Sequence, residues 1–418
     1  MKILWAKANK ILPVHSGGDI RSYNIARELA AQHEVTFFSY YDGARDTAYE
    51  CALREQFPGA VCVCTGRAQD GSLRRGLDYV ARLPRRAPYA VSRFACRAVE
   101  LPLRRWYAQQ AFDVAVCDFL DAAVNFPEEL NIPTVLFQHN VESEIWRRHA
   151  TNGSSPIKKA VYGLEFSKMQ RYEKEMVRRF HHVIAVSEHD KNLMSAWVDP
   201  GRLTVVPTGV DTKEFHPGPK PARENPLVLF VGAMDWEPNV DAVEYFCSEI
   251  WPSILAKVPN AHFRIVGRNP SGRVRRLVGN SVEVTGRVPS VADHLRGAAV
   301  VVVPLRIGGG TRLKIYEAMA TGKAVVSTTV GAEGLDVHHG RDILLCDTPN
   351  NFAESVATMM QDTAACERLE RAAAELAANY GWPLIGARFG QILQAVKRGS
   401  PEVVPSYAEP GENLNTSS

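Results

Sequence analysis

The sequence contains no stretch of apolar residues that approaches the roughly 18 needed to cross a lipid bilayer. Its start, Met1 to Lys7, lacks the long apolar core of a secretory signal peptide. Eight cysteines are present, but no CxxC pair occurs, and Cys62 and Cys64 lie too close together for the usual zinc site. These absences argue against a membrane-spanning protein and against a zinc-binding one. We expect a cytoplasmic protein with buried free thiols and no metal site.

The charge of the chain is nearly balanced. Lys and Arg number 49 against 46 Asp and Glu, which gives a net charge of +3. Proteins that bind nucleic acid usually carry a strong positive excess, so no nucleic-acid partner is indicated. The composition, 45% hydrophobic and 23% charged, is that of a globular protein. A length of 418 residues exceeds the usual size of one domain, so we expect two.

Short apolar runs alternate with helical patterns through the first half of the chain. This βαβ rhythm predicts a doubly wound parallel sheet covered by helices. The expected strands lie at 3–6, 35–40, 114–117, 134–138 and 183–186, and the expected helices include 17–31 and 156–180. The first half is therefore predicted to be a Rossmann-like domain over residues 1–210.

A segment rich in proline and charge, 211–226, interrupts this rhythm and predicts a linker. The rhythm then restarts and predicts a second Rossmann-like domain over residues 227–382. Its expected strands lie at 227–232, 262–266, 300–303, 324–327 and 343–345, and its expected helices at 240–255, 313–320, 351–361 and 364–378. A last helix, 383–396, is expected to pack back on the first domain, and the tail 399–418 is expected to be disordered. The predicted fold is thus α/β, with two doubly wound parallel-sheet domains that face each other across a cleft.

The most informative motif is the glycine-rich turn Gly308-Gly309-Gly310-Thr311-Arg312-Leu313-Lys314, which follows an expected strand and opens an expected helix. Glycines let the backbone approach a ligand, and the first amides of a helix lack partners, so the turn favours phosphate binding. Arg312 and Lys314 add positive charge. Glu317, about one turn into the helix, can accept hydrogen bonds from sugar hydroxyls. The motif therefore suits a nucleotide sugar, although an ordinary turn with a solvated Arg/Lys pair would give the same pattern.

Short motifs follow one another in a fixed order along both halves of the chain. They are Gly17-Gly18 with Arg21, Gln138 to Glu142, Val186 to Glu188, Val206 to Asp211, Phe230 to Met234, Phe263 to Gly267, Thr285 to Val288, Tyr316 to Ala320, and Gly331 to Gly334. Their order and spacing resemble glycosyltransferase family 4, which has the two-domain GT-B fold. The resemblance extends from Lys2 to about Val396. Within the family, the Gly308 to Lys314 run resembles a subgroup tied to exopolysaccharide or cell-surface glycan assembly.

The resemblance implies a retaining transfer of a sugar from a nucleoside-diphosphate donor to a hydroxyl acceptor on a glycan or a lipid-linked glycan. It also implies that no metal and no cofactor is needed, since the nucleotide sugar is itself a co-substrate. Positive groups and helix amides would then stabilise the diphosphate leaving group. Gly17 and Gly18 match the loop that approaches the donor phosphate. His139 matches the family histidine near the reacting sugar, which it would contact through its imidazole or its backbone carbonyl. Glu142, in the same motif, fits equally well as the cap of the following helix.

The sequence departs from the family pattern at two places. Glu317 matches the second glutamate of a pair that grips the ribose, but the position of the first glutamate, eight residues earlier, is Gly309. Backbone amides of Gly309, Gly310 and Thr311, or side chains from elsewhere in the chain, are therefore expected to hold the sugar.

The second departure is that the residues after Gly232 lack the arginine and lysine that many members use for the diphosphate. We expect Arg312 and Lys314 to replace that charge, with Arg306 as a weaker candidate. Glu333, in a glycine-flanked loop, is either a further donor-binding residue or an ordinary surface residue. Asp235 and Trp236 are either residues of the cleft or, for the tryptophan, part of the core.

Arginines are concentrated between Arg74 and Arg105, where aromatic residues are interleaved and only Asp78 and Glu100 are acidic. Such a segment is suited to the surface of an anionic membrane, which predicts a peripheral location on the inner face of the plasma membrane. A solvated basic face, or a groove for an anionic acceptor, would have the same composition.

Two other functions fit the same motifs. One is a sugar-nucleotide epimerase of the GT-B type, which would convert the donor without an acceptor. The other is a catalytically silent protein that binds a nucleotide sugar within an assembly complex, a reading that the missing glutamate and arginine keep open.

Overall fold

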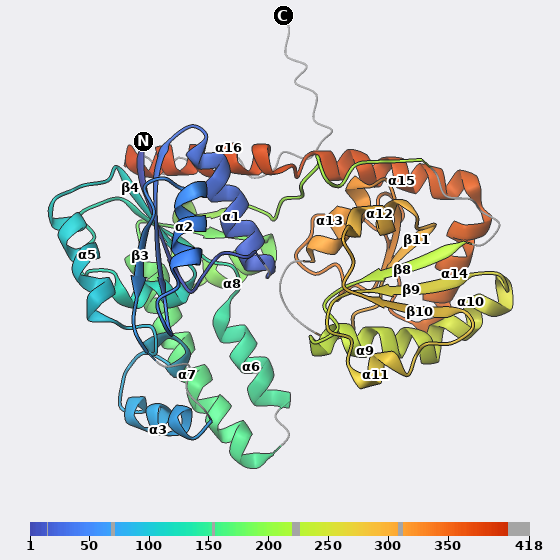
Figure 1. The fold of residues 1–418 in the computed structure, drawn as a ribbon, viewed down its shortest axis with the longest axis horizontal. Helices are drawn as coiled ribbons and strands as arrows, with labels where there is room; N and C mark the ends of the chain where they lie inside the picture. The colour runs from blue at the N-terminus through green and yellow to red at the C-terminus, as the bar shows by residue number, and fades with distance from the viewer. Residues whose placement is uncertain (15, 68–71, 153–154, 220–225, 308–311, 400–418) are drawn as a thin grey trace, which may run out of the picture. The chain divides into compact units, whose positions relative to one another are not determined.

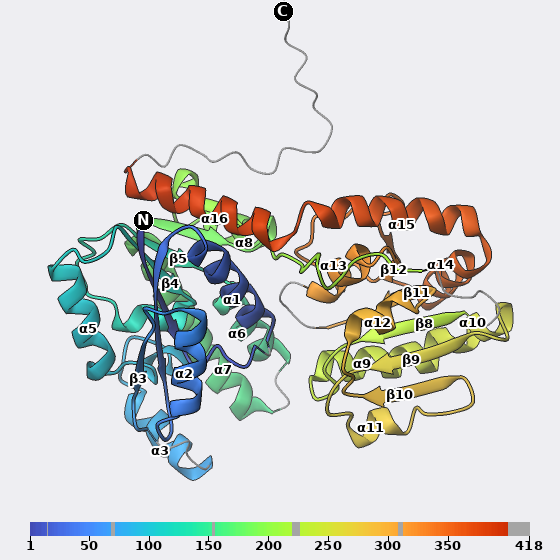
Figure 2. The same cartoon turned by 45° about the horizontal axis from the view of Figure 1, so that its top comes forward.

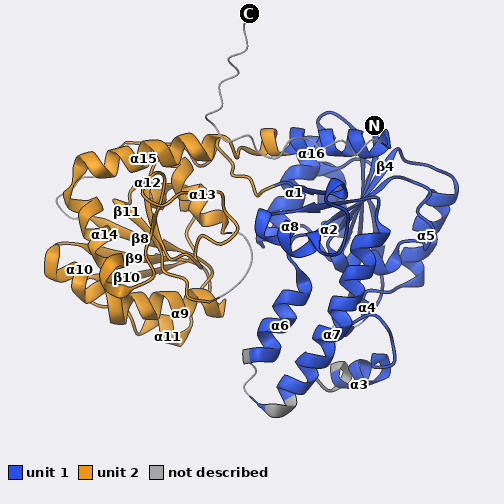
Figure 3. Cartoon of the chain, turned by 180° about the vertical axis from the view of Figure 1, so that it is seen from behind, with its two compact units in different colours: residues 1–206, 386–418 blue, residues 207–385 orange. Residues whose placement is uncertain are grey.

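The computed structural model describes residues 1–399 apart from 15, 68–71, 153–154, 220–225 and 308–311. The chain forms two compact units (Figure 3). Unit 1 comprises residues 1–206 together with the segment that starts at 386, and unit 2 comprises residues 207–385. The predicted tail and most of the predicted linker's second half lie outside the described residues.

Unit 1 is built on a sheet of seven parallel strands (Figure 1). In chain order they are β1 (Lys2–Ala8), β2 (Glu34–Tyr41), β3 (Val61–Cys64), β4 (Val114–Asp118), β5 (Thr134–Phe137), β6 (His182–Ala185) and β7 (Leu203–Val205). Their spatial order is β3-β2-β1-β4-β5-β6-β7. The order reverses between β1 and β4, which is where ligands sit in doubly wound sheets, at the carboxyl ends of the strands.

Helices follow most strands of unit 1. They are α1 (Gly17–Ala30), α2 (Thr47–Gln56), α3 (Ser72–Arg82), α4 (Tyr89–Ser92), α5 (Arg97–Ala108), α6 (Glu142–Asn152), α7 (Pro156–Arg179) and α8 (Glu188–Ser195), with short 3-10 turns η1 (Leu120–Asn125) and η2 (Pro200–Arg202). The last helix of the chain, α16 (Trp382–Lys397), joins them: its Phe389 packs on Trp5 and Phe137 with ring centroids 5.5 and 5.0 Å away. The amphipathic pattern of α16 therefore buries its apolar face in the core of unit 1.

Unit 2 repeats the architecture with six parallel strands in the order β10-β9-β8-β11-β12-β13 (Figure 2). The strands are β8 (Leu227–Val231), β9 (His262–Val266), β10 (Val282–Gly286), β11 (Val300–Val303), β12 (Ala324–Ser327) and β13 (Leu344–Leu345). The helices are α9 (Glu237–Tyr245), α10 (Trp251–Lys257), α11 (Gly272–Arg275), α12 (Val291–Arg296), α13 (Leu313–Ala320), α14 (Pro349–Gln361) and α15 (Thr363–Ala378). The α/β class with two parallel-sheet domains is confirmed.

One predicted helix is divided in the structure. The expected helix 240–255 consists of α9, a π-helical turn η3 (Phe246–Ile250) and α10. Pro252 lies in the first turn of α10 and has no N–H to continue the α-helical ladder, which accounts for the break.

All eight cysteines are free thiols, but the expectation that they are buried holds for only three of them, Cys117, Cys346 and Cys366. Cys51 is exposed, and the other four are half-buried. Across the described part of the chain, no helix combines the length and the apolar character that a membrane span requires.

Candidate functional site

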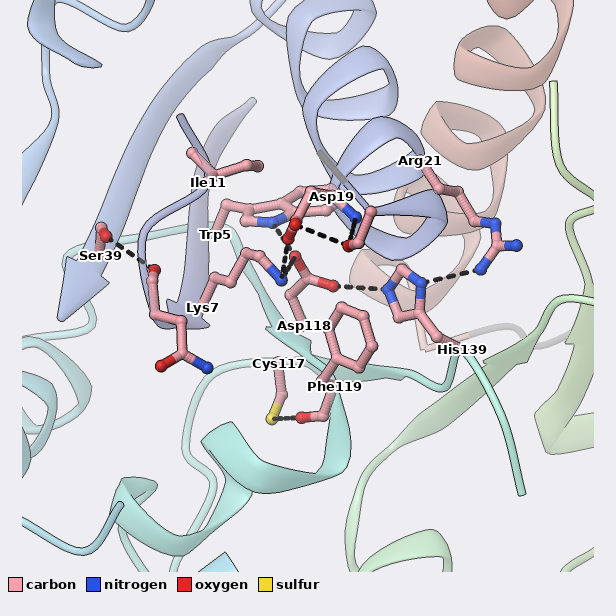
Figure 4. Close-up of polar contacts among 12 residues, drawn as sticks. Trp5, Lys7, Ile11, Asp19, Arg21, Ser39, Cys117, Asp118, Phe119 and His139 are labelled. Carbon is pink, nitrogen blue, oxygen red and sulfur yellow. Dashed lines mark hydrogen bonds and ion pairs between the residues drawn. The ribbon is translucent and has the colours of Figure 1, made fainter. Parts of the chain in front are cut away.

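Polar side chains meet at the carboxyl edge of the unit 1 sheet (Figure 4). Lys7 lies near the end of β1, Asp118 is the last residue of β4, and His139 follows β5. Arg21 reaches the same place from the first turns of α1, after the N-cap Ser16. The parallel register puts Lys7 opposite Asp118, so neighbouring strand ends bring a buried cation and a buried anion together.

Asp118 is the centre of this cluster. Its Oδ1 lies 2.7 Å from His139 Nε2, and its Oδ2 accepts a hydrogen bond of 2.9 Å from Trp5 Nε1. Lys7 Nζ is 3.9 Å from the same Oδ2 and 3.4 Å from Asp19. Burial favours the neutral acid, but the Lys7 charge and the His139 hydrogen bond outweigh it and hold the pKa of Asp118 below its usual value. Asp118 is therefore ionised at neutral pH and fully partnered.

His139 is buried, and protein groups occupy both of its ring nitrogens. Arg21 Nη1 lies 2.9 Å from Nδ1, and a guanidinium can only donate, so Nδ1 accepts and the Nε2–H donates to Asp118. Burial lowers the pKa of His139 to about 3, although Asp118 opposes this shift. The imidazole is thus neutral and held in one tautomer. Of the two contacts predicted for this residue, the backbone carbonyl is the one that this geometry leaves for a sugar.

The close approach of the Phe119 ring explains why residue 18 is a glycine. Phe119, at φ 70°, stacks on the His139 imidazole with centroids 3.7 Å apart and planes 4° from parallel. A Cβ on Gly18 would overlap the Cζ of the Phe119 ring. The second glycine of the Gly17-Gly18 pair therefore makes room for the ring that packs over the site histidine.

Gly18→Ala is accordingly expected to destabilise unit 1 by about 1–3 kcal/mol, because the added methyl forces Phe119 off His139. Gly163→Ala is the matched control, since a Cβ at this half-buried helical position meets nothing within 4 Å. There the change is expected to be neutral or stabilising. Urea unfolding of both variants checks the prediction, and equal stabilities would contradict it.

In unit 2, the predicted strand–turn–helix is present as β11 and α13. Gly309, Gly310 and Thr311 lie outside the described residues, so their predicted contacts with the donor stay predictions. Arg312 is the N-cap of α13, and Lys314 is the second residue of the helix. The two cations predicted to bind the diphosphate thus belong to one helix N-terminus.

Lys314 points to the end of strand β8. Its Nζ donates to Asn239 Oδ1 at 3.0 Å and lies 4.3 Å over the Phe230 ring. Gly232 makes room for both side chains, because a Cβ there would be 2.8 Å from Lys314 Nζ and 2.7 Å from Asn239 Nδ2. Burial, with Arg312 nearby, lowers the pKa of Lys314 to about 7 although Glu317 opposes the shift. An arriving anion would restore the full charge of this amine.

Arg312 is buried and stacks on a tryptophan. Its guanidinium carbon lies 5.3 Å from the centre of the Trp236 ring. Trp236 is 40% exposed, so the core alternative for this residue is wrong. The loop after β8, which lacks the family's arginine and lysine, therefore receives its cations from α13. Arg306, the weaker candidate, pairs with Asp241 at 2.6 Å and lies over Tyr245 instead.

The two candidate glutamates of unit 2 are half-buried. Burial and the charge of Glu214 raise the pKa of Glu317 to about 7, against the opposing effect of Lys314. Lys314 and Glu317 are three residues apart, which puts them on one face of α13. Glu333 lies in the loop after β12, where Gly331 packs so closely on Ser327 and Val303 that no Cβ would fit. Its role with the donor stays a prediction.

Glu142 is not the cap of α6. Glu173 on α7 has that role, since its carboxylate accepts from the backbone N–H groups of Glu142 and Ser143 at 2.7 and 3.0 Å. Burial, followed by the charge of Glu173, raises the pKa of Glu142 to about 8. The alternative that Glu142 caps α6 is therefore wrong, because Glu173 of the next helix supplies the cap.

Sequence reasoning missed three residues of these clusters. Lys7 and Asp118 lie within apolar strands, and their charge inside a buried run was the signal that could have identified them. Asn239 lies on the first turns of α9 and is buried. Nothing in its neighbourhood in the sequence distinguishes it from a surface residue of a helix.

A cavity of about 600 Å³ adjoins the carboxyl ends of β1, β2 and β3 in unit 1. Its lining includes Lys10, Asp42, Arg45 and Cys64. Lys10 and Arg45 are cations and Asp42 is an anion, so the walls combine both signs of charge. Such a lining suits a small polar molecule with many hydroxyls.

Two parallel-sheet domains with cationic and acidic side chains at their strand ends define a protein of the GT-B class. Family models agree: residues 15–214 match "Glycosyltransferase Family 4", and residues 225–362 match "Glycosyl transferases group 1". The chain belongs to glycosyltransferase family 4.

Individual relatives are distant. A 44.6 kDa protein of the cps region of Klebsiella pneumoniae is 24% identical over 52% of this chain and 57% of its own length. The phosphatidyl-myo-inositol mannosyltransferase of Mycolicibacterium smegmatis is 27% identical over 49% of this chain and 54% of its own. The chain thus spans about half the length of the curated relatives it matches. Anabaena HepE, solved with UDP-glucose, superposes over 94% of this chain and 100% of its own with a TM-score of 0.64 and 15% identity.

Proposed function

We propose that this protein is a retaining, metal-independent glycosyltransferase that moves a sugar from a nucleoside-diphosphate donor to a hydroxyl acceptor. The observation that carries the proposal is the face of α13, where Lys314 and Glu317 lie one turn apart beside Gly232 and Asn239. A cation and a carboxylate at this spacing suit a diphosphate and the hydroxyls of a ribose. The fold shared with HepE, which binds UDP-glucose, supports a nucleotide sugar.

In this reaction the bond from the sugar to the diphosphate breaks, and negative charge grows on the departing phosphate. Lys314 and Arg312 are placed to stabilise that charge from α13, a role that needs no proton transfer. Unit 1 contributes rigid positioning. Asp118 and Arg21 hold His139 in one tautomer. We expect its backbone carbonyl to contact the transferred sugar.

The affinity for the donor is expected to be bell-shaped in pH with a maximum near 7. Lys314 binds phosphate as a cation, and because its pKa is lowered to about 7, affinity falls above that pH. Glu317 accepts ribose hydroxyls as an anion, and because its pKa is raised to about 7, affinity falls below that pH. Each limb has a limiting slope of about tenfold per pH unit.

Calorimetric titration of a nucleotide sugar from pH 5 to 9 tests this profile, since the phosphates of the donor do not titrate there. Lys314→Met is expected to remove the alkaline decline, and Glu317→Gln the acid one. A flat profile in the native protein would contradict the assignment of both groups.

The acceptor is proposed to be a glycan or a lipid-linked glycan used in exopolysaccharide or cell-surface assembly. The match to a protein of the cps region of Klebsiella pneumoniae supports this, as does the resemblance of the Gly308 to Lys314 run to the same subgroup. We place the acceptor's sugar on unit 1, where the cavity beside Lys10 and Asp42 offers mixed polar walls.

Incubation with a labelled nucleotide sugar, with and without glycan acceptors, tests the proposed activity. A transferase releases nucleoside diphosphate in amounts that rise with acceptor, and nuclear magnetic resonance would find the donor's anomeric configuration retained in the product. An epimerase would instead change the donor without any acceptor. A silent binder would bind the donor and leave it unchanged, and either result would overturn the proposal.

A further inference from the structure

Helix α3 turns apolar side chains outward. Leu77 is 71% exposed and Val80 is 61% exposed, so neither side chain is part of the core. Ala81 and Pro84 are also exposed. Val80, Ala81 and Pro84 follow Leu77 by three, four and seven residues, which is the spacing of one helix face. A surface helix normally turns such a stripe towards the core of its own domain. Among the described residues of unit 1, the stripe of α3 therefore has no cover.

The stripe continues onto α7. Two side chains of α7 hold the segment around α3: Glu165 accepts from the Tyr89 N–H at 2.8 Å, and Lys168 donates to the Leu83 carbonyl at 2.5 Å. Val161 and Leu164 lie four residues before these two, so they occupy the same face of α7 one turn further on.

Val161 and Leu164 are 36% and 45% exposed. Together with Leu77 and Val80 they are four of the nine large hydrophobic side chains that are exposed among the described residues. Figure 1 shows α3 and the first half of α7 at the end of unit 1 opposite α16. These four residues define one face, which we call the α3–α7 face.

Positive charge surrounds the α3–α7 face. Arg85 and Arg86 are exposed just after α3, and Lys158 and Lys159 are exposed at the start of α7. The acidic side chain of α3, Asp78, pairs with Arg82 at 2.7 Å, and Glu165 is buried. The face therefore presents aliphatic side chains framed by cations.

The structure also divides the arginine-rich segment 74–105. The side chains of Arg74 and Arg75 lie outside the described residues. On α5, Arg104 pairs with Glu100 at 2.6 Å, and before it Arg93 lies 4.5 Å over the Phe94 ring. The surface that we consider therefore starts from the exposed Arg85 and Arg86, and it extends to α7, which the sequence did not indicate.

We infer that the α3–α7 face docks on an anionic lipid bilayer, with its aliphatic side chains in the interface and its cations at the headgroups. Aliphatic side chains bounded by Lys and Arg are the pattern of interfacial helices. A protein partner is less well matched, because protein interfaces are enriched in aromatic residues and depleted of lysine. Here the nearby Tyr79 and Tyr89 pack on each other instead, with ring centroids 5.3 Å apart. The inference is independent of the proposed reaction, because it needs neither donor nor acceptor.

Co-sedimentation of the full chain with lipid vesicles tests the inference. The vesicles are phosphatidylcholine alone and phosphatidylcholine mixed with phosphatidylglycerol, at low and high salt. Binding is expected only to the mixed vesicles and is expected to weaken with salt. Absence of binding to the mixed vesicles, or equal binding to both kinds, would overturn the inference.

Two glutamate variants distinguish the effect of this face from that of an exposed leucine elsewhere. Leu77→Glu with Val80→Glu is expected to weaken binding to the mixed vesicles by about 10-fold or more. Leu101→Glu is the matched control, because Leu101 is 54% exposed but lies on α5, and it is expected to leave binding unchanged. An equal loss in both variants would overturn the inference.

A gain-of-binding variant keeps the test independent of folding defects. Val80→Trp adds an interfacial anchor at an exposed position and is expected to strengthen binding to the mixed vesicles. An unchanged or weaker binding of this variant, with an unchanged melting temperature, would count against the α3–α7 face.

Discussion

Lys314→Met is expected to slow sugar transfer by roughly 30- to 1000-fold, which corresponds to about 2–4 kcal/mol of lost transition-state stabilisation. The amine belongs to α13 and is held at the end of β8 by Asn239, where the family's usual cations are missing. Without this amine, the departing diphosphate loses an electrostatic attraction that strengthens as the bond breaks. Turnover number and donor KM, measured separately, show whether the loss lies in the chemical step.

The same change is expected to leave the fold at least as stable as before. Burial depresses the pKa of Lys314 from 10.5 to about 7, so holding the amine charged costs folding stability below pH 7, and this cost disappears above the unfolded value. Methionine removes the cost. Lys257→Met, on α10 of the same unit, is the control and is expected to keep full activity, because this exposed lysine pairs with Glu354 on the surface.

Arg312→Ala is expected to slow transfer to a similar extent, and its melting temperature must be measured because the guanidinium is buried on Trp236. If both Lys314→Met and Arg312→Ala kept turnover within about threefold of the native protein, the assignment of the diphosphate site to α13 would be wrong.

The largest expected effect on stability is that of Asp118→Asn in unit 1. Three groups converge on this carboxylate: the His139 ring, the Trp5 indole and the Lys7 ammonium. The amide keeps the shape but removes the charge and turns an acceptor into a donor. Removing one partner of a buried ionic cluster costs about 3–5 kcal/mol, because the remaining charge stays buried without compensation.

Asp113→Asn is the matched control for this prediction. Asp113 comes just before β4, at the opposite end of the strand, and pairs with Lys397 at 2.8 Å on the surface. Its loss is expected to cost at most about 1 kcal/mol. Urea unfolding followed by tryptophan fluorescence compares the two, since Trp5 reports on unit 1 directly. Similar stabilities for both variants would mean that the buried cluster contributes little.

The fold was largely predictable because buried parallel strands are continuous apolar runs. Val300 to Val303 and the start of β1 are clear examples of such apolar runs. The missed strands lie at edges or are very short: β3 has four residues of intermediate burial, β7 has three residues, and β10 ends the second sheet. The missed strands differ from the predicted ones because β3 and β10 are edge strands with mostly half-buried residues and β7 is only three residues long.

The candidate site was predictable where a local motif carries it and not where distant segments meet. Arg312, Lys314 and Glu317 follow from one turn and one helix. The partners of Lys314 and His139 come from elsewhere in the chain: Asn239 is 75 residues away from Lys314, and Asp118 is 21 from His139. Their roles depend on strand order, which apolar periodicity does not specify.

The central claim is that unit 2 binds a nucleoside-diphosphate sugar through α13. A thermal-shift comparison of the native protein and Lys314→Met against UDP-, GDP-, ADP- and dTDP-sugars tests it most directly. One nucleotide family is predicted to stabilise the native protein, by about 2.7 kcal/mol at 100 times its Kd, with a much smaller shift for the variant. No shift with any donor, or an equal shift in both proteins, would contradict the claim.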